Sequence, residues 1–333
     1  MTTAERRGRG GPGRHLGRID RILDRILDRV WLAPEDPTAL GLVRIAVVAV
    51  LTASLLTHIG AVAEYFSHAS PLQGEWAREA FPSRVSLFFW IEQPWAVRAI
   101  FALGVVAHLL WLVGRFTGPA SVVAWLLWVS MSGRSPLLYS LPDQLQMAMC
   151  TLLMVMPSGR GVSLDARRHG PRPVPVWCRR LLMIQLAAMY TATGVLKSGA
   201  TWHRDHTALY YSLVNPYNRH FDAAELFAGL QWMLGPMTAV VVWWETLFAA
   251  FVALHAVRSL LGRPRWFPDL RWPVLGFGVL MHLGIQGALY VAWFSPLVLS
   301  VYFAFLTPDE ARRAIARTRV IFAHRHRRPR SGS

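Results

Sequence analysis

Long apolar segments recur along this chain, and they constrain its fold more than any other feature. They lie at 40–59, 95–113, 121–131, 144–156, 177–196, 236–257, 272–290 and 294–306. A straight helix needs about 20 apolar residues to cross the hydrocarbon core of a membrane. The segments 121–131, 144–156 and 294–306 are shorter, so we expect them to extend into their flanks or to lie inside a bundle. Because backbone in lipid must satisfy its own hydrogen bonds, the sequence predicts an all-α, multi-pass transmembrane helical bundle of about eight spans.

The composition agrees with a membrane protein. Hydrophobic residues make up 53% of the 333 positions and charged residues only 16%, whereas soluble domains carry about 25% charged residues. The two cysteines, Cys150 and Cys178, lie in or beside apolar segments. We interpret them as packing residues, so no disulfide framework is predicted.

The formal charge of +16 is concentrated in the two termini and in short loops. Basic loops alternate with mixed ones, as eight crossings require, and the positive-inside rule then places both termini in the cytoplasm of a cell-membrane protein. This pattern favours anionic membrane lipid as the partner and argues against nucleic acid. The first apolar segment begins near Leu40, too far along the chain for a simple cleavable signal, so we expect it to be retained as an anchor.

The apolar region from 38 to 306 is flanked by polar segments. Residues 1–15 are rich in Gly and Arg and predict a disordered basic tail. Residues 16–33 repeat a four-residue pattern, RILD-RILD-RVWL, which places apolar residues on one helical face. We interpret this segment as an amphipathic helix in the membrane surface, ended by Pro34. An ordinary surface helix packed on the bundle is the alternative. Residues 307–333 predict a basic cytoplasmic tail.

One lysine, Lys197, stands at the end of the apolar segment 177–196, while 34 other positions carry arginine. A lysine at a span end can simply lift its amine to the interface, and its survival in an arginine-rich chain can be chance. An amine can, however, lose its proton when partly desolvated, so it can act as a base, which a guanidinium cannot. Tyr190 and Thr193 share its helical face. A polar stripe on a spanning helix predicts a face turned into the bundle.

Other polar residues lie inside or beside the apolar segments. Glu245 is near the middle of 236–257 and His282 is in the middle of 272–290, with Gln286 one turn further on. Glu245 and His282 are at similar depth and could meet; each is either part of a functional site or a partner in a structural hydrogen bond between helices. Asp143 opens the segment 144–156 in the pattern of a helix N-cap.

The loop after Lys197 is rich in histidine and aromatic residues. His203, His206 and His220 lie among acidic residues, but fuller ligand patterns are missing, so no metal site is predicted. Trp202 and the tyrosines of this loop suit the aromatic belt of a membrane interface.

Several stretches resemble the HTTM membrane proteins, the bacterial relatives of the vitamin K-dependent γ-carboxylase. The matching pieces are "RSPLLYSLPDQLQ…MPSGRGVSLD", "QLAAMYTATGVLKSGATW", the Glu of 236–257 and "MHLGIQGALYVAWFSP". "TALYYSL" resembles the branch that matures sporulation-delaying peptide toxins. The resemblance implies that Lys197 is the base activated by a reduced quinone such as vitamin K, in a site facing outward, and that His282 is functional. It does not extend to the large lumenal domain of the carboxylase, and His206 stands near where relatives often have glycine.

Two functions follow from these residues. In the first, a membrane enzyme acts on a peptide or a lipid-soluble molecule, with Lys197, Glu245, His282 and Asp143 as catalytic residues. Tyr190, Trp202 and Gln286 would then contact the substrate. In the second, a non-catalytic accessory protein helps a secreted peptide toxin to mature, to be exported or to be resisted. A transporter is less favoured because the chain has no evident repeats.

Overall fold

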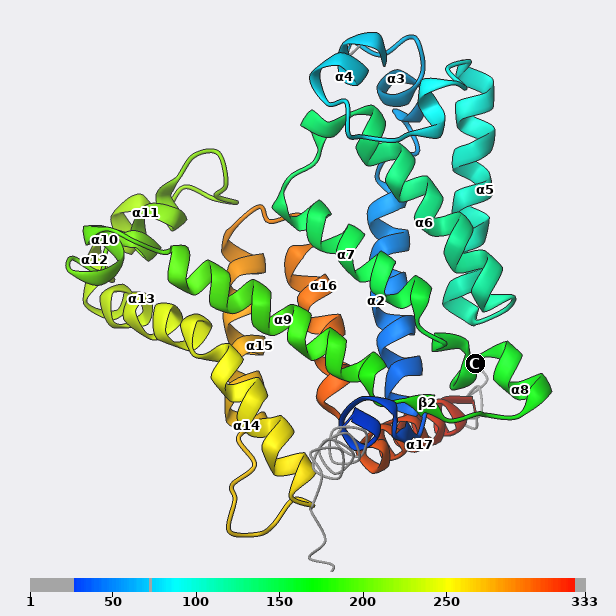
Figure 1. The fold of residues 1–333 in the computed structure, drawn as a ribbon. Coiled ribbons are helices and arrows are strands. Elements are labelled where there is room, and N and C mark those ends of the chain that lie inside the picture. Colours follow the sequence, from blue (N-terminus) through cyan, green and yellow to red (C-terminus); the bar gives the residue numbers. More distant parts are fainter. Residues whose placement is uncertain (1–26, 72–73, 327–333) are drawn as a thin grey trace, which may run out of the picture.

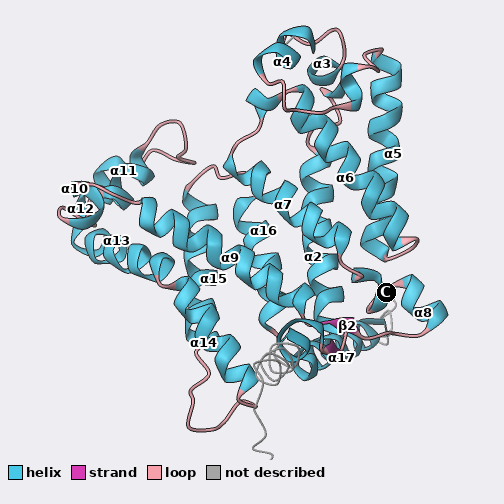
Figure 2. Ribbon diagram, in the orientation of Figure 1, coloured by secondary structure: helices cyan, strands magenta, loops and turns pink. Residues whose placement is uncertain are grey.

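A computed structural model describes residues 27–71 and 74–326, with backbone alone for 318–326. Its regular secondary structure is helical apart from two short strands, and loops connect the helices, which confirms the all-α prediction (Figure 2). The long helices are α2 (Thr38–Leu56), α5 (Pro94–Val113), α6 (Thr117–Arg134), α7 (Leu141–Val155), α9 (Trp177–Leu196), α13 (Gln231–Thr246), α14 (Phe248–Leu260), α15 (Arg271–Ala288) and α17 (Pro308–His326).

Shorter elements connect them. The short α-helices are α3 (Val62–Phe66), α4 (Gly74–Ala80), α8 (Leu164–His169), α10 (Ala200–His203), α11 (Ala208–Val214), α12 (Ala224–Gly229) and α16 (Phe294–Val301). The tighter or wider turns are η1 (Asp28–Leu32), η2 (Leu87–Phe89), η3 (Pro136–Leu138), η4 (Ser158–Arg160) and η5 (Tyr302–Phe305). The strands are β1 (Pro34–Glu35) and β2 (Val174–Pro175), which pair antiparallel.

The predicted segments correspond to helices, and local signals explain several ends. The segment 177–196 is α9, with the predicted bounds. Helix α5 begins at Pro94, where proline suits a helix start, and ends at Gly114, whose φ of 72° is in the left-handed region that favours glycine. The short segments 121–131 and 144–156 extend into their flanks, as α6 and α7.

Fewer helices meet the requirements for crossing a membrane than the sequence predicts. By length and apolar composition, α2 and α5 can cross, and α13 with α14 forms a third span if the pair counts as one. Within residues 27–71 and 74–326, no other helix meets both requirements. Helix α9 has the length, but Arg179 and Arg180 in its first turn lower its mean hydropathy. The count of eight crossings therefore stays a prediction.

The segment 236–257, predicted as one span, is broken. Its residues belong to α13 and α14, which meet at Leu247 at an angle of 49°. The hydroxyl of Thr191 on α9 accepts from the backbone N–H of Ala249 (3.1 Å) and donates to the carbonyl of Glu245 (3.4 Å). These are the two groups that an unbroken helix would join, and a side chain inserted between them is a known cause of kinks.

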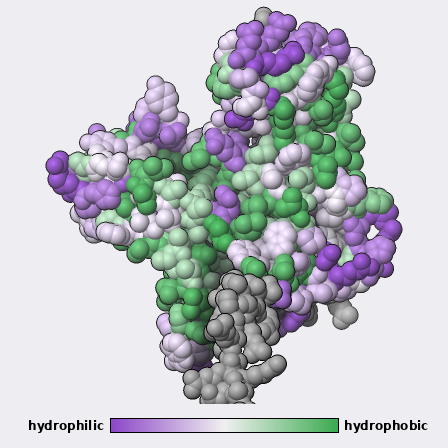
Figure 3. All heavy atoms as spheres, in the orientation of Figure 1, coloured by the Kyte–Doolittle hydropathy of each residue, from purple (hydrophilic) through white to green (hydrophobic). Residues whose placement is uncertain are grey.

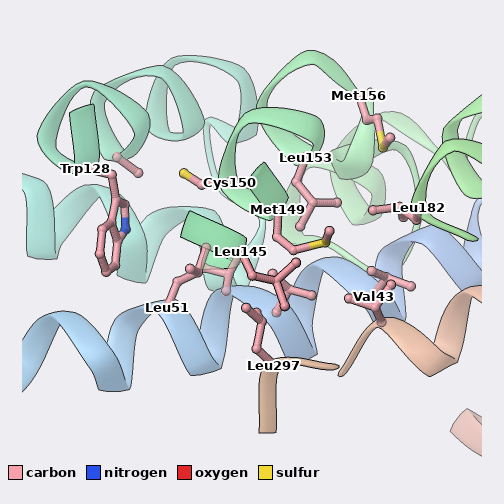
Figure 4. Packing of buried hydrophobic residues seen from close by; sticks show 14 of the residues in the cluster. Val43, Leu51, Trp128, Leu145, Met149, Cys150, Leu153, Met156, Leu182 and Leu297 are labelled. Carbon is pink, nitrogen blue, oxygen red and sulfur yellow. The ribbon is translucent and has the colours of Figure 1, made fainter. Parts of the chain in front are cut away.

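The core is built around α2. This helix packs against α5 on one side and α16 on the other, while α9 packs against α13 and α14 (Figure 1). Val43 and Leu51 of α2 contact a core that includes Met149, Leu182 and Leu297, all buried (Figure 4). Apolar side chains cover the middle of the molecule, and polar ones gather over α3 and α4, at α10–α12 and at α8 (Figure 3).

Ion pairs join the segments at the end of the molecule where β1, β2 and α17 lie (Figure 1). Arg179 pairs with Glu35, and Arg271 pairs with both Asp269 (2.6 Å) and Glu310 (2.8 Å). Hydrogen bonds from Arg271 lower the pKa of Asp269 from 3.8 to about 2, against the opposing effect of burial. The cluster ties the start of α17 to the start of α15.

The flanking predictions are tested only in part. Residues 1–15 and most of the predicted amphipathic helix 16–33 lie outside the described residues. Its last residues form η1, a wide helical turn, and Pro34 begins β1 as expected for a helix end. Within 307–333, predicted as a basic tail, residues 308–326 form α17.

Candidate functional site

Helices α9 and α13 approach closely at the end of α9. A side chain on Gly194 would place its Cβ 2.5 Å from the backbone nitrogen of Thr246 and 2.6 Å from its hydroxyl. Glycine is therefore required for the two backbones to lie this close. The approach brings the last turn of α9 against the residues that precede the kink between α13 and α14.

Lys197 is the C-terminal cap of α9, and its amine pairs with the carboxylate of Glu245 on α13. The pair is mostly shielded, with 19% of the lysine side chain and 10% of the glutamate side chain exposed. The hydroxyl of Thr193 lies 3.2 Å from Glu245 Oε2, and the carbonyl of Thr193 lies 3.5 Å from the amine. Thr193 therefore does lie on the face of Lys197, as predicted.

The ring of Trp202 also lies against the amine of Lys197. The Lys197 Nζ lies 5.3 Å from the centre of the Trp202 ring, within range of a cation–π contact. His203 donates from Nε2 to the carbonyl of Lys197 (2.6 Å), and the Nδ1 of His206 lies 2.9 Å from the carbonyl of Trp202. His206 has a φ of 51°, a left-handed conformation that glycine adopts without strain.

A second polar group lies deeper in the bundle, around His282. The Tyr190 hydroxyl lies 2.6 Å from His282 Nε2 and 2.8 Å from the Tyr302 hydroxyl, and His282 Nδ1 lies 3.2 Å from the hydroxyl of Ser295. Tyr190 and His282 are 2% and 1% exposed. Both ring nitrogens of the histidine therefore have partners within the chain.

Glu245 and His282, which similar depth allows to meet, have different partners in the structure. Among the described residues, the carboxylate contacts Lys197 and Thr193, while the imidazole contacts Tyr190 and Ser295. The two groups are linked through α9, since the Thr193 hydroxyl also lies 2.9 Å from the carbonyl of Tyr190.

An aromatic wall surrounds Tyr190. Its ring lies 4.8 Å from that of Trp244 and 4.5 Å from that of Phe248, between centres. A side chain on Gly278 would collide with the Tyr302 hydroxyl and with Trp244. Sequence reasoning missed Tyr302 and Trp244. Both lie in apolar segments, so in the sequence only the polar group of each side chain, the Tyr302 hydroxyl or the Trp244 indole N–H, marks it as a candidate site residue.

Asp143 and Gln286 lie outside both groups. Asp143 forms a capping box with Ser140, whose backbone N–H and hydroxyl both lie 2.8 Å from Oδ2, so its position is that of a helix cap. Gln286 donates to the carbonyl of Ala292 (3.4 Å), and its buried Oε1 has no protein partner among the described residues.

The histidines of the segment after Lys197 are dispersed. His203 and His206 contact backbone carbonyls, and His220 lies against the ring of Tyr290 at 4.6 Å. Within residues 27–71 and 74–326, no three His, Cys, Asp or Glu side chains are grouped to hold a metal ion.

The fold and the site define a helical protein with helices long and apolar enough to span a membrane and a shielded lysine–glutamate pair between two helices. Residues 32–309 match the HTTM domain family, and the chain belongs to that family. The resemblance seen in the sequence is thereby confirmed at the level of the family. Searches of curated proteins and of solved structures returned no significant match.

Proposed function

We propose that this HTTM protein is a membrane enzyme that uses Lys197 as a base on a peptide or a lipid-soluble substrate. The observation that carries the proposal is the shielded contact between the only lysine of the chain and the carboxylate of Glu245. A catalytic base must lie within hydrogen-bond reach of its proton partners, and the lysine amine lies within reach of Glu245.

The pairing explains why a lysine serves where arginine would not. A proton can pass from the ammonium to the carboxylate, which leaves a neutral amine beside a neutral acid with no change in total charge. A guanidinium stays protonated, so an arginine at 197 could hold Glu245 but could not accept a proton. In this proposal Glu245 stores the proton, and Trp202 orients the amine and excludes water.

The deeper group would position the substrate. Tyr190 lies between the two groups, because its hydroxyl contacts His282 and its carbonyl contacts Thr193. We assign His282 and Tyr190 to orientation and hydrogen bonding rather than to the first proton transfer. Asp143 and Gln286, which lie apart, receive no role in this mechanism.

The resemblance to the γ-carboxylase implies a reduced quinone as cofactor, and one part of the structure fits such a group. A groove of about 610 Å³ between α15 and the segment 299–306 is lined mostly by apolar side chains, with Tyr302 and, at the start of α15, Arg271. Leu275, Val279 and Leu299 would hold an apolar tail, and Tyr302 would hold the polar ring. The bound cofactor would supply reducing equivalents, while residues of the chain would orient it.

We also propose the eight-span topology, with cytoplasmic termini in a cell membrane. It is supported by family membership and by the arginines Arg179 and Arg271 at the same end as both strands and α17. Reporter fusions after residues 70, 200 and 320 test it: the first two are expected outside and the third inside.

A non-catalytic accessory for a secreted peptide toxin is the second candidate. The closed ion pair favours it, since Lys197 already has a carboxylate and an aromatic partner and needs no substrate to be satisfied. Lys197 would then fix α9 to α13 and form part of a surface for a partner protein.

Substitution of Lys197 by arginine separates the two candidates. In a strain that lacks the natural copy, the intact masses of secreted peptides are compared between cells with the native chain, Lys197→Arg and Arg219→Lys. The enzyme proposal expects a mass difference that Lys197→Arg abolishes and Arg219→Lys preserves. Equal peptide masses with Lys197→Arg and the native chain would refute a base role on a secreted peptide, provided that both chains reach the membrane in equal amounts.

A further inference from the structure

A long groove opens on the side of the bundle where α2 begins and α5 ends. It has a volume of about 1090 Å³ and lies between α2, α5, the segment 162–171 and α17. Thr38 and Ala49 both line it, and a helix rises about 1.5 Å per residue, so the groove follows roughly 17 Å of α2. Helices α2 and α5 are candidate spans, so this groove runs from hydrocarbon depth to headgroup depth.

The membrane part of the groove is apolar. Ile45 and Ala49 line it from α2, and Leu112 and Val113 line it from α5. A peptide in such a place would need partners for its backbone N–H and C=O groups, because unpaired polar groups are costly in apolar surroundings. An acyl chain has no such requirement, so the lining favours a lipid chain.

The other end of the groove is basic. Arg167 of α8 and Arg312 of α17 line it. Arg312 is already paired with Asp36 and Asp309, whereas Arg167 has no ion-pair partner among the described residues. Arg167 is also exposed. Its guanidinium is therefore the cation available to an anionic headgroup.

The opposite side of α8 adds to this charge. A hollow of about 430 Å³ there is lined by Arg160, His169 and Arg172, with Asp165 as its one acidic residue, and it shares Ala166 and Gly170 with the groove. Basic side chains thus lie on both sides of one short helix, at the depth where phosphates of a bilayer are found. Basic pockets of this kind between spanning helices bind anionic headgroups.

The nearby start of α6 does not offer a competing site for an anion. The carboxylate of Asp165 accepts from the backbone N–H of Thr117 (2.9 Å), its hydroxyl (2.8 Å) and the N–H of Phe116 (3.1 Å). Burial raises the pKa of Asp165, but these hydrogen bonds outweigh it and hold the pKa below its usual range. An ionised Asp165 already occupies that helix end, so arginine side chains must bind the phosphate.

We propose that this groove binds a phospholipid with an anionic headgroup, its phosphate on Arg167 and one acyl chain along Ile45 and Ala49. The inference is independent of the function proposed for Lys197. It rests on two features that lie side by side: the apolar part of the groove, at the ends of α2 and α5, and Arg167, which has no ion-pair partner among the described residues.

The test is native mass spectrometry of the full chain in detergent, titrated with phosphatidylglycerol or phosphatidylcholine. Arg167→Gln removes the proposed phosphate contact, and Arg168→Gln makes the same change one residue along, outside the groove. Ala49→Phe fills the apolar part, and Ala102→Phe enlarges an exposed alanine of α5 outside it. Thermal unfolding of each variant shows whether it is folded.

We expect the native chain to prefer phosphatidylglycerol. Arg167→Gln should weaken that binding about fivefold, the loss expected for one basic residue near a membrane surface. Ala49→Phe should weaken the binding of both lipids, and the two control variants should leave it unchanged. Equal binding of the two lipids, equal loss with Arg167→Gln and Arg168→Gln, or displacement of the lipid by inorganic phosphate alone would each overturn the proposal.

Discussion

Removing the charge of Glu245 should destabilise the fold mainly because the ammonium of Lys197 loses its carboxylate partner. Glu245→Gln keeps the size of the side chain and its capacity to accept from Thr193, but it leaves the ammonium without a carboxylate. Lys197→Met keeps the aliphatic stem and removes the ammonium. These two variants and their combination form a double-mutant cycle, which isolates the interaction between the two side chains.

The expected coupling follows from the geometry. Two unit charges about 4 Å apart attract by about 4 kcal/mol at an effective dielectric constant of about 20. Desolvation of both groups offsets part of this, because only 19% and 10% of the side chains remain exposed. We therefore expect a coupling free energy of about 2 kcal/mol between Lys197 and Glu245.

The assay is equilibrium unfolding of purified protein from mixed micelles, followed by tryptophan fluorescence. The control cycle uses Arg219→Met and Asp222→Asn, which remove an ion pair in the segment between α9 and α13 whose carboxylate side chain is 67% exposed. Exposed pairs contribute about 0–1 kcal/mol. A Lys197–Glu245 coupling no larger than that of the control pair would refute the conclusion that the pair is shielded and holds α9 to α13.

Three further predictions concern packing, hydrogen bonding and pH. Gly194→Ala should cost about 1–3 kcal/mol of unfolding free energy, because its Cβ would overlap the backbone of α13. The control Gly284→Ala has open space around it and should cost nothing, so equal costs of the two variants in chemical denaturation would contradict this prediction. Tyr190→Phe should cost about 1–3 kcal/mol because it leaves the buried His282 Nε2 without its partner; thermal unfolding measures the loss, and an unchanged midpoint would rule out a strong bond. The lowered pKa of Asp269 contributes stability that is present above pH 3.8 and is lost as the pH falls toward 2. Asp269→Asn should remove this acid dependence of the thermal unfolding midpoint. An equal fall of the midpoint with pH in the native chain and in Asp269→Asn would show that another group is responsible.

Much of the helical structure was predictable because its signals are local. The bounds of α9 follow from an apolar run, and those of α5 from Pro94 and Gly114. The kink between α13 and α14 was not predictable from the same run. It depends on the hydroxyl of Thr191, which lies on another helix.

The candidate site was predictable in content but not in pairing. Lys197, Glu245, Tyr190 and His282 stand out in any reading of this sequence, because polar side chains in apolar segments are costly and need partners. Depth along a helix suggested that Glu245 could meet His282. Depth says nothing about the rotation of each helix about its axis, and rotation determined the partners.

By itself, therefore, the sequence determined which segments are helices, where the single lysine lies and which polar groups must be satisfied inside the bundle. These properties depend on apolar runs, helix caps and the cost of burying a polar group. The tertiary structure decided that Lys197 pairs with Glu245, 48 positions away, and Tyr190 with His282, 92 positions away. Such partners are set by how helices pack side by side, and close approach at Gly194 is what places the lysine against its carboxylate.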